Sequence, residues 1–289
     1  MSTAMRLLHG DFGRVALLRM NAPLVVHAHH HCHILIKASG ANAAFNVNGT
    51  QVPLTAHNAV LVNAWEPHAF IAGPNGAAQT EVLALYVEPS WLGQHHAHFS
   101  GSVYSKFFAK PIAYISPTQA TIIQKIVSEL WSAEEIGHVS IEELLVELCL
   151  SFLFESGGPF RTYSRLYSQG KTFMDPRIRT AIALLKESPV LLEDVTALAA
   201  SVDLSRSRFF ELFRECTGLS PVLYINALKM ERAFQAIATT DRSLEAISVD
   251  LGFSAQGHFS RFFRQHQGVL PSHYRRNLEL GQPRNRTYR

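Results

Sequence analysis

The sequence predicts an antiparallel β domain at the N-terminus followed by an all-helical domain at the C-terminus. Residues 17–87 contain short apolar runs separated by turn residues such as Asn48-Gly49, and Asn-Gly favours a tight hairpin because it accepts positive φ at both central positions. After residue 117 the apolar residues recur every three or four positions, as they do on one face of a helix. A length of 289 residues suits two domains of ordinary size.

The predicted strands are short apolar runs at regular spacing, which is typical of an antiparallel sandwich or barrel. They comprise residues 24–26, 34–36, 44–47, 59–62 and 82–87. Two amphipathic helices follow, one carrying Ile122, Ile126 and Leu130 and the next carrying Leu144 and Leu148 on one face. Their apolar stripes need a partner, which is either their own β domain alone or a second subunit as well.

Composition excludes several classes of protein. With 47% hydrophobic and 17% charged residues the chain is not largely disordered, and no apolar run reaches the ~20 residues of a membrane span. Residues 1–20 are broken by charges and so lack a signal-peptide core. The three cysteines are widely spaced and odd in number, which indicates free thiols in a reducing compartment. We therefore expect a cytoplasmic protein.

Charge and histidine are unevenly distributed along the chain. Residues 1–174 carry a net charge of −1 and most of the 15 histidines, whereas residues 175–289 carry a net charge of +4. A basic half is typical of a protein with an anionic partner, although a solvated basic surface gives the same count. Residues 155–171 are rich in glycine and serine with little apolar periodicity, which predicts a linker between the halves.

The most informative feature is an internal duplication in the C-terminal half. Residues 205–224 and 254–274 match at an offset of 50, which pairs two phenylalanines, a glycine, a proline and a tyrosine of each copy. The pairs are Phe209 with Phe259, Phe213 with Phe263, Gly218 with Gly268, Pro221 with Pro271 and Tyr224 with Tyr274. Before Phe209 and Phe259, the matching residues of the two copies lie 49 positions apart and not 50. One residue is therefore inserted at the start of the second copy's recognition helix.

Each copy has the plan of a helix-turn-helix unit. A short helix (195–201 or 244–250) with small residues precedes a tight turn, a serine caps the next helix, and that helix buries aromatic residues four apart and ends at glycine. The second helix of such a unit enters the major groove of DNA. A plain helical bundle built from duplicated hairpins is the alternative, and the number of matching positions weighs against it.

Residues 176–276 resemble the DNA-binding domain of AraC/XylS-type transcription regulators. The second copy carries the closer match, through residues 250–254, 259–263 and 268–275. The resemblance implies a cupin-like β-barrel with two dimerisation helices (1–156), a linker (157–172), two helix-turn-helix units joined by a long helix near 222–239 (173–276), and a basic tail (277–289). It further implies a homodimer that binds double-stranded DNA, a small-molecule effector and RNA polymerase, and that activates a catabolic or stress-related operon.

The resemblance also implies which residues contact DNA. Positions near the start of each recognition helix face base edges, and here these are Arg206, Ser207, Phe210, Glu211, Gln256, Gly257, Ser260 and Arg261. Arg261 suits guanine and Gln256 suits adenine, whereas Glu211 stands where the family often has arginine. The candidates for phosphate contacts are Arg208, Arg214, Lys229, Arg232, Arg264 and Arg275.

The β domain contains a histidine cluster. His27, His29, His31 and His33 share one face if they lie on a strand, and His68 follows after Trp65. The spacing resembles that of metal-binding cupins, but the carboxylate ligand is missing. We expect an effector pocket, without a metal or other cofactor, lined by His27, His29, His33, Trp65 and His68. One alternative is a metal held by His27, His29, His33 and His68. The other is that these histidines are purely structural. A metal-dependent cupin enzyme fused to a helical domain is the alternative function, and we expect no enzyme.

Overall fold

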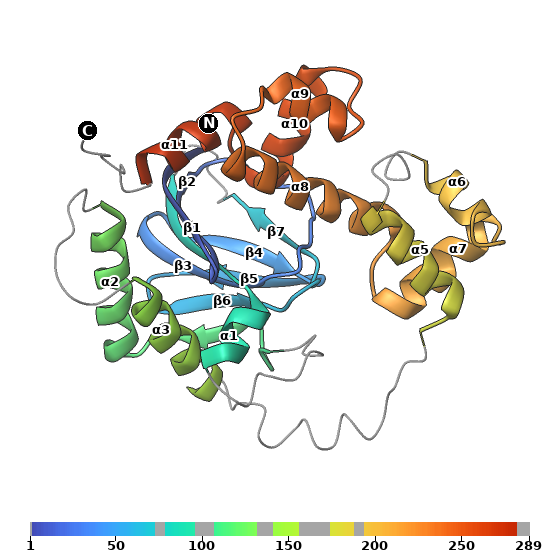
Figure 1. Cartoon of the computed structure of the whole chain (residues 1–289). Helices are drawn as coiled ribbons and strands as arrows, with labels where there is room; N and C mark the ends of the chain where they lie inside the picture. The colour runs from blue at the N-terminus through green and yellow to red at the C-terminus, as the bar shows by residue number, and fades with distance from the viewer. Residues whose placement is uncertain are drawn as a thin grey trace.

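A computed structural model describes residues 2–72, 79–95, 107–131, 141–155, 174–187 and 194–281. The described residues of the N-terminal part form a β domain with helices packed against it (Figure 1). Its strands are β1 (Thr3–Gly10), β2 (Gly13–Met20), β3 (Cys32–Gly40), β4 (Ala43–Val47), β5 (Thr50–Leu54), β6 (Asn58–Val62), β7 (His68–Ile71), β8 (Thr80–Val87) and β9 (Ile112–Tyr114). Its helices are α1 (Pro89–His95), α2 (Pro117–Trp131) and α3 (Ile141–Glu155).

The described strands form two sheets and not one closed barrel. The larger has the order β1-β2-β8-β3-β6-β9 and the smaller the order β5-β4-β7, and every pairing is antiparallel. Alternation along β2 and β8 turns Leu18 and Ala84 toward the smaller sheet, and turns Leu17 and Leu85 toward the helices. The arrangement is therefore the sandwich that the sequence left open, with an apolar core on each face of the larger sheet.

Helices α2 and α3 cover the outer face of the larger sheet. Ile126 and Leu148 are fully buried there beside strand residues such as Ile34. The apolar stripes of these helices thus pack on their own β domain, as one of the two alternatives expected. Cys32 and Cys149 are buried, Cys216 is half-buried, and all three are free thiols as predicted.

The C-terminal part is wholly helical, as the periodicity predicts. Its helices are α5 (Pro176–Glu187), α6 (Val195–Ala200), α7 (Arg206–Thr217), α8 (Pro221–Thr239), α9 (Leu244–Asp250), α10 (Gln256–Gln267) and α11 (Pro271–Gly281). We call α6 and α7 the first helix-turn-helix unit and α9 and α10 the second. Helix α8 links them: the second unit and α11 lie against the β domain, and the first unit lies to one side (Figure 1).

The two units repeat the same backbone features. Gly218 and Gly268 end α7 and α10 in the left-handed conformation, with φ of 76° and 82°. The paired turn residues Asp203 and Gly252 also have positive φ, 56° and 76°, because the tight turn between the helices requires it. Aspartate is one of the few other residues that tolerate this conformation.

The predicted serine cap is present in the first unit and absent in the second. Ser205 accepts a hydrogen bond from the backbone N–H of Arg208, whereas α10 begins after Ala255, which cannot cap it. Ser254 instead forms a hydrogen bond with His258. The inserted residue moved the second helix one position past its serine.

Helix α11 runs to Gly281, so residues 277–281, expected in the basic tail, are helical. The predicted linker, 157–172, lies outside the described residues. None of the described helices combines the length and the apolar composition that are needed to cross a membrane.

The unequal caps predict opposite effects of two substitutions. Ser205→Ala should lower the free energy of unfolding by about 1 kcal/mol, because it leaves a backbone N–H of α7 without its acceptor. Ala255→Ser should raise it by up to about 1 kcal/mol by giving α10 the cap it lacks. Urea unfolding followed by circular dichroism measures both. Ser207→Ala, at an exposed position inside α7, is the control and should change stability by less than about 0.5 kcal/mol; equal losses at Ser205 and Ser207 would contradict the cap assignment.

Candidate nucleic-acid interface and ligand site

The predicted base-reading residues lie on the outer sides of α7 and α10. Arg206, Ser207, Glu211, Gln256, Gly257 and Arg261 are exposed, and Phe210 and Ser260 are half-buried. The phenylalanines between them, such as Phe209 and Phe259, are fully buried and fix the rotation of each helix. The four-residue aromatic spacing therefore decides which polar side chains face solvent.

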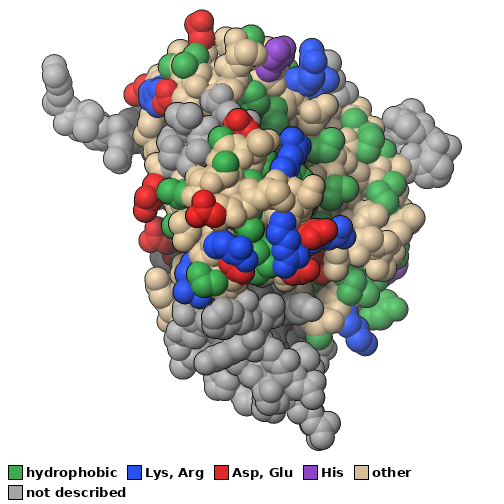
Figure 2. Space-filling view, turned by 90° about the vertical axis from the view of Figure 1, so that its right-hand side faces the viewer, with side chains coloured by type: hydrophobic (Ala, Val, Ile, Leu, Met, Phe, Trp, Pro, Cys, Tyr) green, Lys and Arg blue, Asp and Glu red, His purple; other side chains and the backbone are tan. Residues whose placement is uncertain are grey.

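The two recognition helices differ in charge. In the first unit, Glu211 forms an ion pair with Arg208 at 3.2 Å, and Arg206 lies over the Phe210 ring at 5.5 Å. In the second unit, the described residues provide no acidic partner for Arg261 within ion-pair distance. Figure 2, which looks onto the side of the first unit, shows Lys and Arg interspersed with Asp and Glu. The first unit thus neutralises part of its own positive charge.

The candidate phosphate-binding residues fall into two groups. Arg208, Arg214 and Arg264 are exposed, and Arg214 and Arg264 hold equivalent positions in the last turns of α7 and α10. The other three are half-buried: Lys229 lies over the Phe253 ring, Arg232 donates to the carbonyls of Leu185 and Lys186 at the end of α5, and part of the Arg275 guanidinium is enclosed. The capping role of Arg232 was not visible in the sequence.

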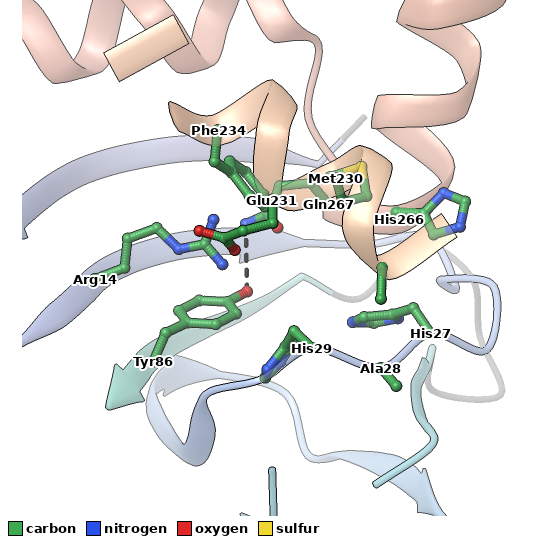
Figure 3. Close-up of a pocket in the computed structure, with 11 residues that line it drawn as sticks. Arg14, His27, Ala28, His29, Tyr86, Met230, Glu231, Phe234, His266 and Gln267 are labelled. Atoms are coloured by element: carbon green, nitrogen blue, oxygen red, sulfur yellow. Dashed lines mark hydrogen bonds between the residues drawn. The ribbon is translucent and has the colours of Figure 1, made fainter. Parts of the chain in front are cut away.

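A small cavity lies at the junction where the β domain meets α8 and α10 (Figure 3). Its volume is about 20 Å³, which suits a water molecule or an ion. Its lining comprises Arg14, His27, Ala28, His29 and Tyr86 from the β domain, and Ala227, Met230, Glu231, Phe234, His266 and Gln267 from the helices. The Gln267 amide donates to the Tyr86 hydroxyl across the junction, at 3.3 Å.

Arg14 is the central contact of this junction. Arg14 is 3% exposed, and its guanidinium lies between the rings of Tyr86 and Phe234, at 3.9 and 3.6 Å from their centroids. The Tyr274 hydroxyl adds to its polar surroundings and lies 2.7 Å from His9 Nε2. In the described structure, Nε and Nη1 of Arg14 are buried without a hydrogen-bond partner. A β-strand cation is thus enclosed by aromatic groups of α8 and α11.

The structure brings together four of the histidines that the sequence singled out. His27, His29, His33 and His68 form one buried group, in which the His33 and His68 ring nitrogens lie 3.4 Å apart. The expected strand is wrong for residues 27–31, because β3 begins only at Cys32. His31 consequently turns toward His30, with which it shares Glu88 as an acidic neighbour.

The aromatic residues near the expected pocket have different positions. Phe45 and Phe70 are core residues in contact with each other, and Tyr86 stacks on His33 and lines the cavity. Trp65, with a positive φ of 62°, stacks on Tyr224 of α8 at 4.7 Å. Trp65 therefore joins the β domain to α8 and does not line the cavity.

Sequence reasoning missed Arg14, Glu231 and His266. Arg14 had a signal, since alternation along β2 places it on the same inward face as Ala16 and Leu18. No pattern in the sequence indicates Glu231 or His266, because their places at the cavity depend on how the helices dock on the β domain.

Two known families match this chain. Residues 23–149 match the AraC-like ligand binding domain, and residues 198–277 match a helix-turn-helix domain. The raffinose operon transcriptional regulatory protein RafR of Pediococcus pentosaceus is 26% identical over 167 residues, which are 58% of this chain and 60% of RafR. The HTH-type transcriptional regulator GbdR of Pseudomonas aeruginosa is 32% identical over 111 residues, 37% of this chain and 29% of GbdR.

The chain spans about half the length of the curated relatives it matches, with 48%, 60% and 52% for the first three. Among solved structures, ToxT from Vibrio cholerae O395 superposes with a TM-score of 0.54 at 13% identity, over 91% of this chain and 97% of ToxT. This likeness supports the fold: a β domain with helices, followed by two helix-turn-helix units.

The buried histidines predict a loss of stability in acid. Burial lowers the pKa of His68 to about 4 and, together with the charge of Arg14, that of His9 to about 3; it also lowers the pKa values of His27, His29 and His33. The unfolded chain therefore binds more protons than the folded protein between about pH 6.5 and pH 4. The free energy of unfolding should fall as pH falls through this window, by up to about 1.4 kcal/mol per pH unit for each such histidine.

Urea unfolding at pH 7.5, 6.5 and 5.5 measures this slope. His68→Gln should flatten it, because one neutral buried imidazole is removed, whereas His57→Gln, at an exposed position, should leave it unchanged. A free energy of unfolding that is constant between pH 7 and pH 5 would contradict the prediction.

Proposed function

We propose that the chain is a member of the AraC family of transcription regulators, and that it is a sequence-specific DNA-binding regulator whose DNA binding responds to a small effector. The observation that carries the proposal is the duplicated helix-turn-helix unit, whose two recognition helices expose polar side chains at equivalent positions. The match of residues 23–149 to a ligand-binding domain supports the effector.

We infer that the second unit is the main reader of guanine. Arg261 is exposed, and an arginine without an acidic partner can donate two hydrogen bonds to guanine O6 and N7. In the first unit the Arg208–Glu211 pair must open, or Glu211 must accept from cytosine, before α7 reads a base. Arg214 and Arg264 occupy the same place in each unit and contact phosphates on either side of the groove.

We infer that the effector acts at the junction between the β domain and α8. The cavity there has room for about one water molecule or ion, so an organic effector would enter it only if α8 and α10 moved away from the β domain. Binding would then favour an arrangement in which the second unit is released. A ligand shifts such an equilibrium only by its different affinity for the two arrangements.

The remaining expectations rest on family membership. We propose that the protein is a cytoplasmic homodimer, with α3 at the subunit interface, and an activator that contacts RNA polymerase at a catabolic or stress-related operon. We further propose that it is not an enzyme, because the named relatives are regulators.

Two arginines of α10 test the DNA-binding roles. A site selected from random duplexes with the full-length protein provides the probe, and fluorescence anisotropy gives the affinity for this site and for its single-base variants. Arg261→Ala should remove about 1–3 kcal/mol of discrimination at one base pair. Arg264→Ala should weaken binding to all variants alike and lower the slope of log K against log salt by about 1.

The matched pair separates reading from charge, because both arginines are exposed and lie one turn apart on α10. An unchanged base preference in Arg261→Ala would refute the reading role. Failure of the full-length protein to select any sequence would refute the proposed function itself.

A further inference from the structure

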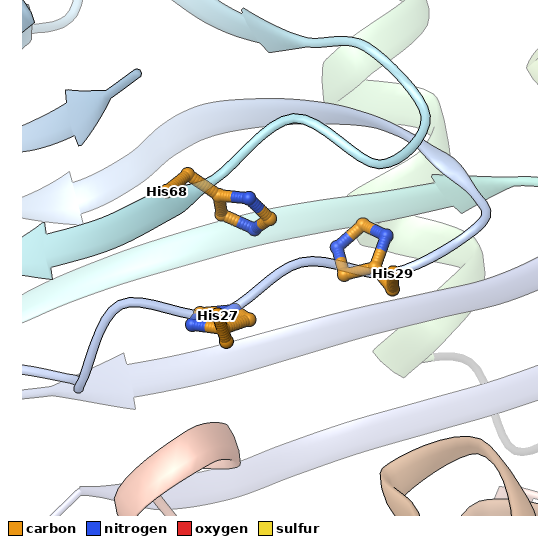
Figure 4. Close-up of side chains that lie close together, drawn as sticks. All are labelled: His27, His29 and His68. Atoms are coloured by element: carbon orange, nitrogen blue, oxygen red, sulfur yellow. The ribbon is translucent and has the colours of Figure 1, made fainter. Parts of the chain in front are cut away.

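Three histidine side chains converge in the β domain (Figure 4). His27 and His29 come from the segment before β3, and His68 from the start of β7. Two backbone hydrogen bonds between His27 and His68, of 2.9 and 2.8 Å, hold the two segments together. Each of the three residues offers one ring nitrogen, and these nitrogens lie within 4.8 Å of one another. Small rotations of these side chains would let a single ion contact all three, because zinc–nitrogen bonds are about 2.0–2.1 Å long.

The backbone fixes the tautomer of each ring. The Nδ1 atoms of His27, His29 and His68 lie 2.9, 3.0 and 2.8 Å from the carbonyl oxygens of Val25, His31 and Glu66. A carbonyl only accepts, so each Nδ1 carries the hydrogen and each Nε2 presents a lone pair. A backbone carbonyl on one ring nitrogen is the usual second partner of a histidine whose other nitrogen binds a metal.

Two of the Nε2 atoms are poorly satisfied. His29 Nε2 is buried without a hydrogen-bond partner in the described structure, and His68 Nε2 has a long hydrogen bond with His33 Nδ1, at 3.4 Å. Burial keeps all three rings neutral, which is the form that binds metals. Leaving buried acceptors unpaired is costly, and a cation would remove that cost.

We propose that His27, His29 and His68 bind a divalent transition metal of the zinc class. Three neutral imidazoles suit Zn²⁺, which is commonly tetrahedral with an open fourth position. His27 and His29 also line the cavity of about 20 Å³, which has room for the water that would occupy that position. The Nδ1–H of His33 must turn away from His68 when the metal enters.

The neighbouring group of His30, His31 and Glu231 has a simpler explanation. These residues also come within ligand distance of one another, but His30 already contacts Glu88 at 3.1 Å and Glu231 at 3.7 Å. These contacts of His30 with the two carboxylates account for the arrangement without a metal. No such partner exists in the described structure for the Nε2 of His29.

The proposed site lies next to the second helix-turn-helix unit. The His27 ring is 6.4 Å from the ring of His266 on α10, and both line the junction cavity. Metal occupancy would therefore bear on how α10 docks against the β domain. This regulatory consequence rests on the proposed function, whereas metal binding itself does not.

Zinc titration of the tag-free, full-length protein tests the site. We expect one Zn²⁺ per chain in calorimetry at pH 7.5, a higher melting temperature with Zn²⁺, and a tetrahedral absorption spectrum when Co²⁺ is added. His29→Gln is the sharpest variant, because its Nε2 has no protein partner to lose. It should weaken Zn²⁺ binding about a hundredfold or more. His27→Gln and His68→Gln should do the same.

His30→Gln and His57→Gln are the matched controls and should bind Zn²⁺ like the unaltered protein. Circular dichroism of each variant without metal separates loss of binding from loss of folding. If the His27 and His68 variants do not fold, the His29 variant alone provides the test. No Zn²⁺ binding by the unaltered protein, or equal binding by His29→Gln, would overturn the proposal. The anisotropy assay with DNA is independent, so a failure to bind DNA while Zn²⁺ binds would refute only the proposed function.

Discussion

The buried guanidinium of Arg14 constrains how the two halves of this protein meet. Arg14 is 3% exposed, and the groups around its charge come from both halves: the Tyr86 ring in β8, the Phe234 ring in α8 and the Tyr274 hydroxyl in α11. Separating the two halves would expose the aromatic rings to solvent. It would also remove the groups of α8 and α11 that surround the Arg14 guanidinium. Arg14 thereby joins the β domain to α8 and α11, beside other polar contacts across this interface such as Gln267–Tyr86 and Asn277–Ala4.

The two helix-turn-helix units consequently differ in their attachment. The core of the second unit, with Phe259 and Phe263, is continuous with the inner core of the β sandwich. The first unit has a separate core, around Phe209 and Phe213. Among the described residues, Ala28 and Trp65 are the β-domain members of this core. A change at the junction would act first on the second unit and reach the first unit through α8. The histidine group lies at this junction, so metal binding and domain docking would share one set of contacts.

Much of the fold was predictable because it depends on local rules. The paired phenylalanines, the helix-ending glycines and the apolar alternation of the strands report local geometry directly, and the structure confirms them. The serine cap of the second unit was wrong because a one-residue insertion moved the helix start to Ala255. Trp65 was misplaced for a different reason: its partner, Tyr224, is 159 positions away, and nothing local indicates that stack.

The sequence alone determined the duplicated units and their recognition positions, because these follow from a repeated pattern. It also singled out His27, His29, His33 and His68, whereas the pairing of His27 with His68 that brings them together is a tertiary contact. Only the tertiary structure decided that Arg14, Glu231 and His266 share a cavity, and that each proposed zinc-binding imidazole is held through Nδ1 by a carbonyl. The reason is physical: these contacts depend on how a β sandwich and a helical domain dock, and docking is set by shape and by buried charge across the whole chain.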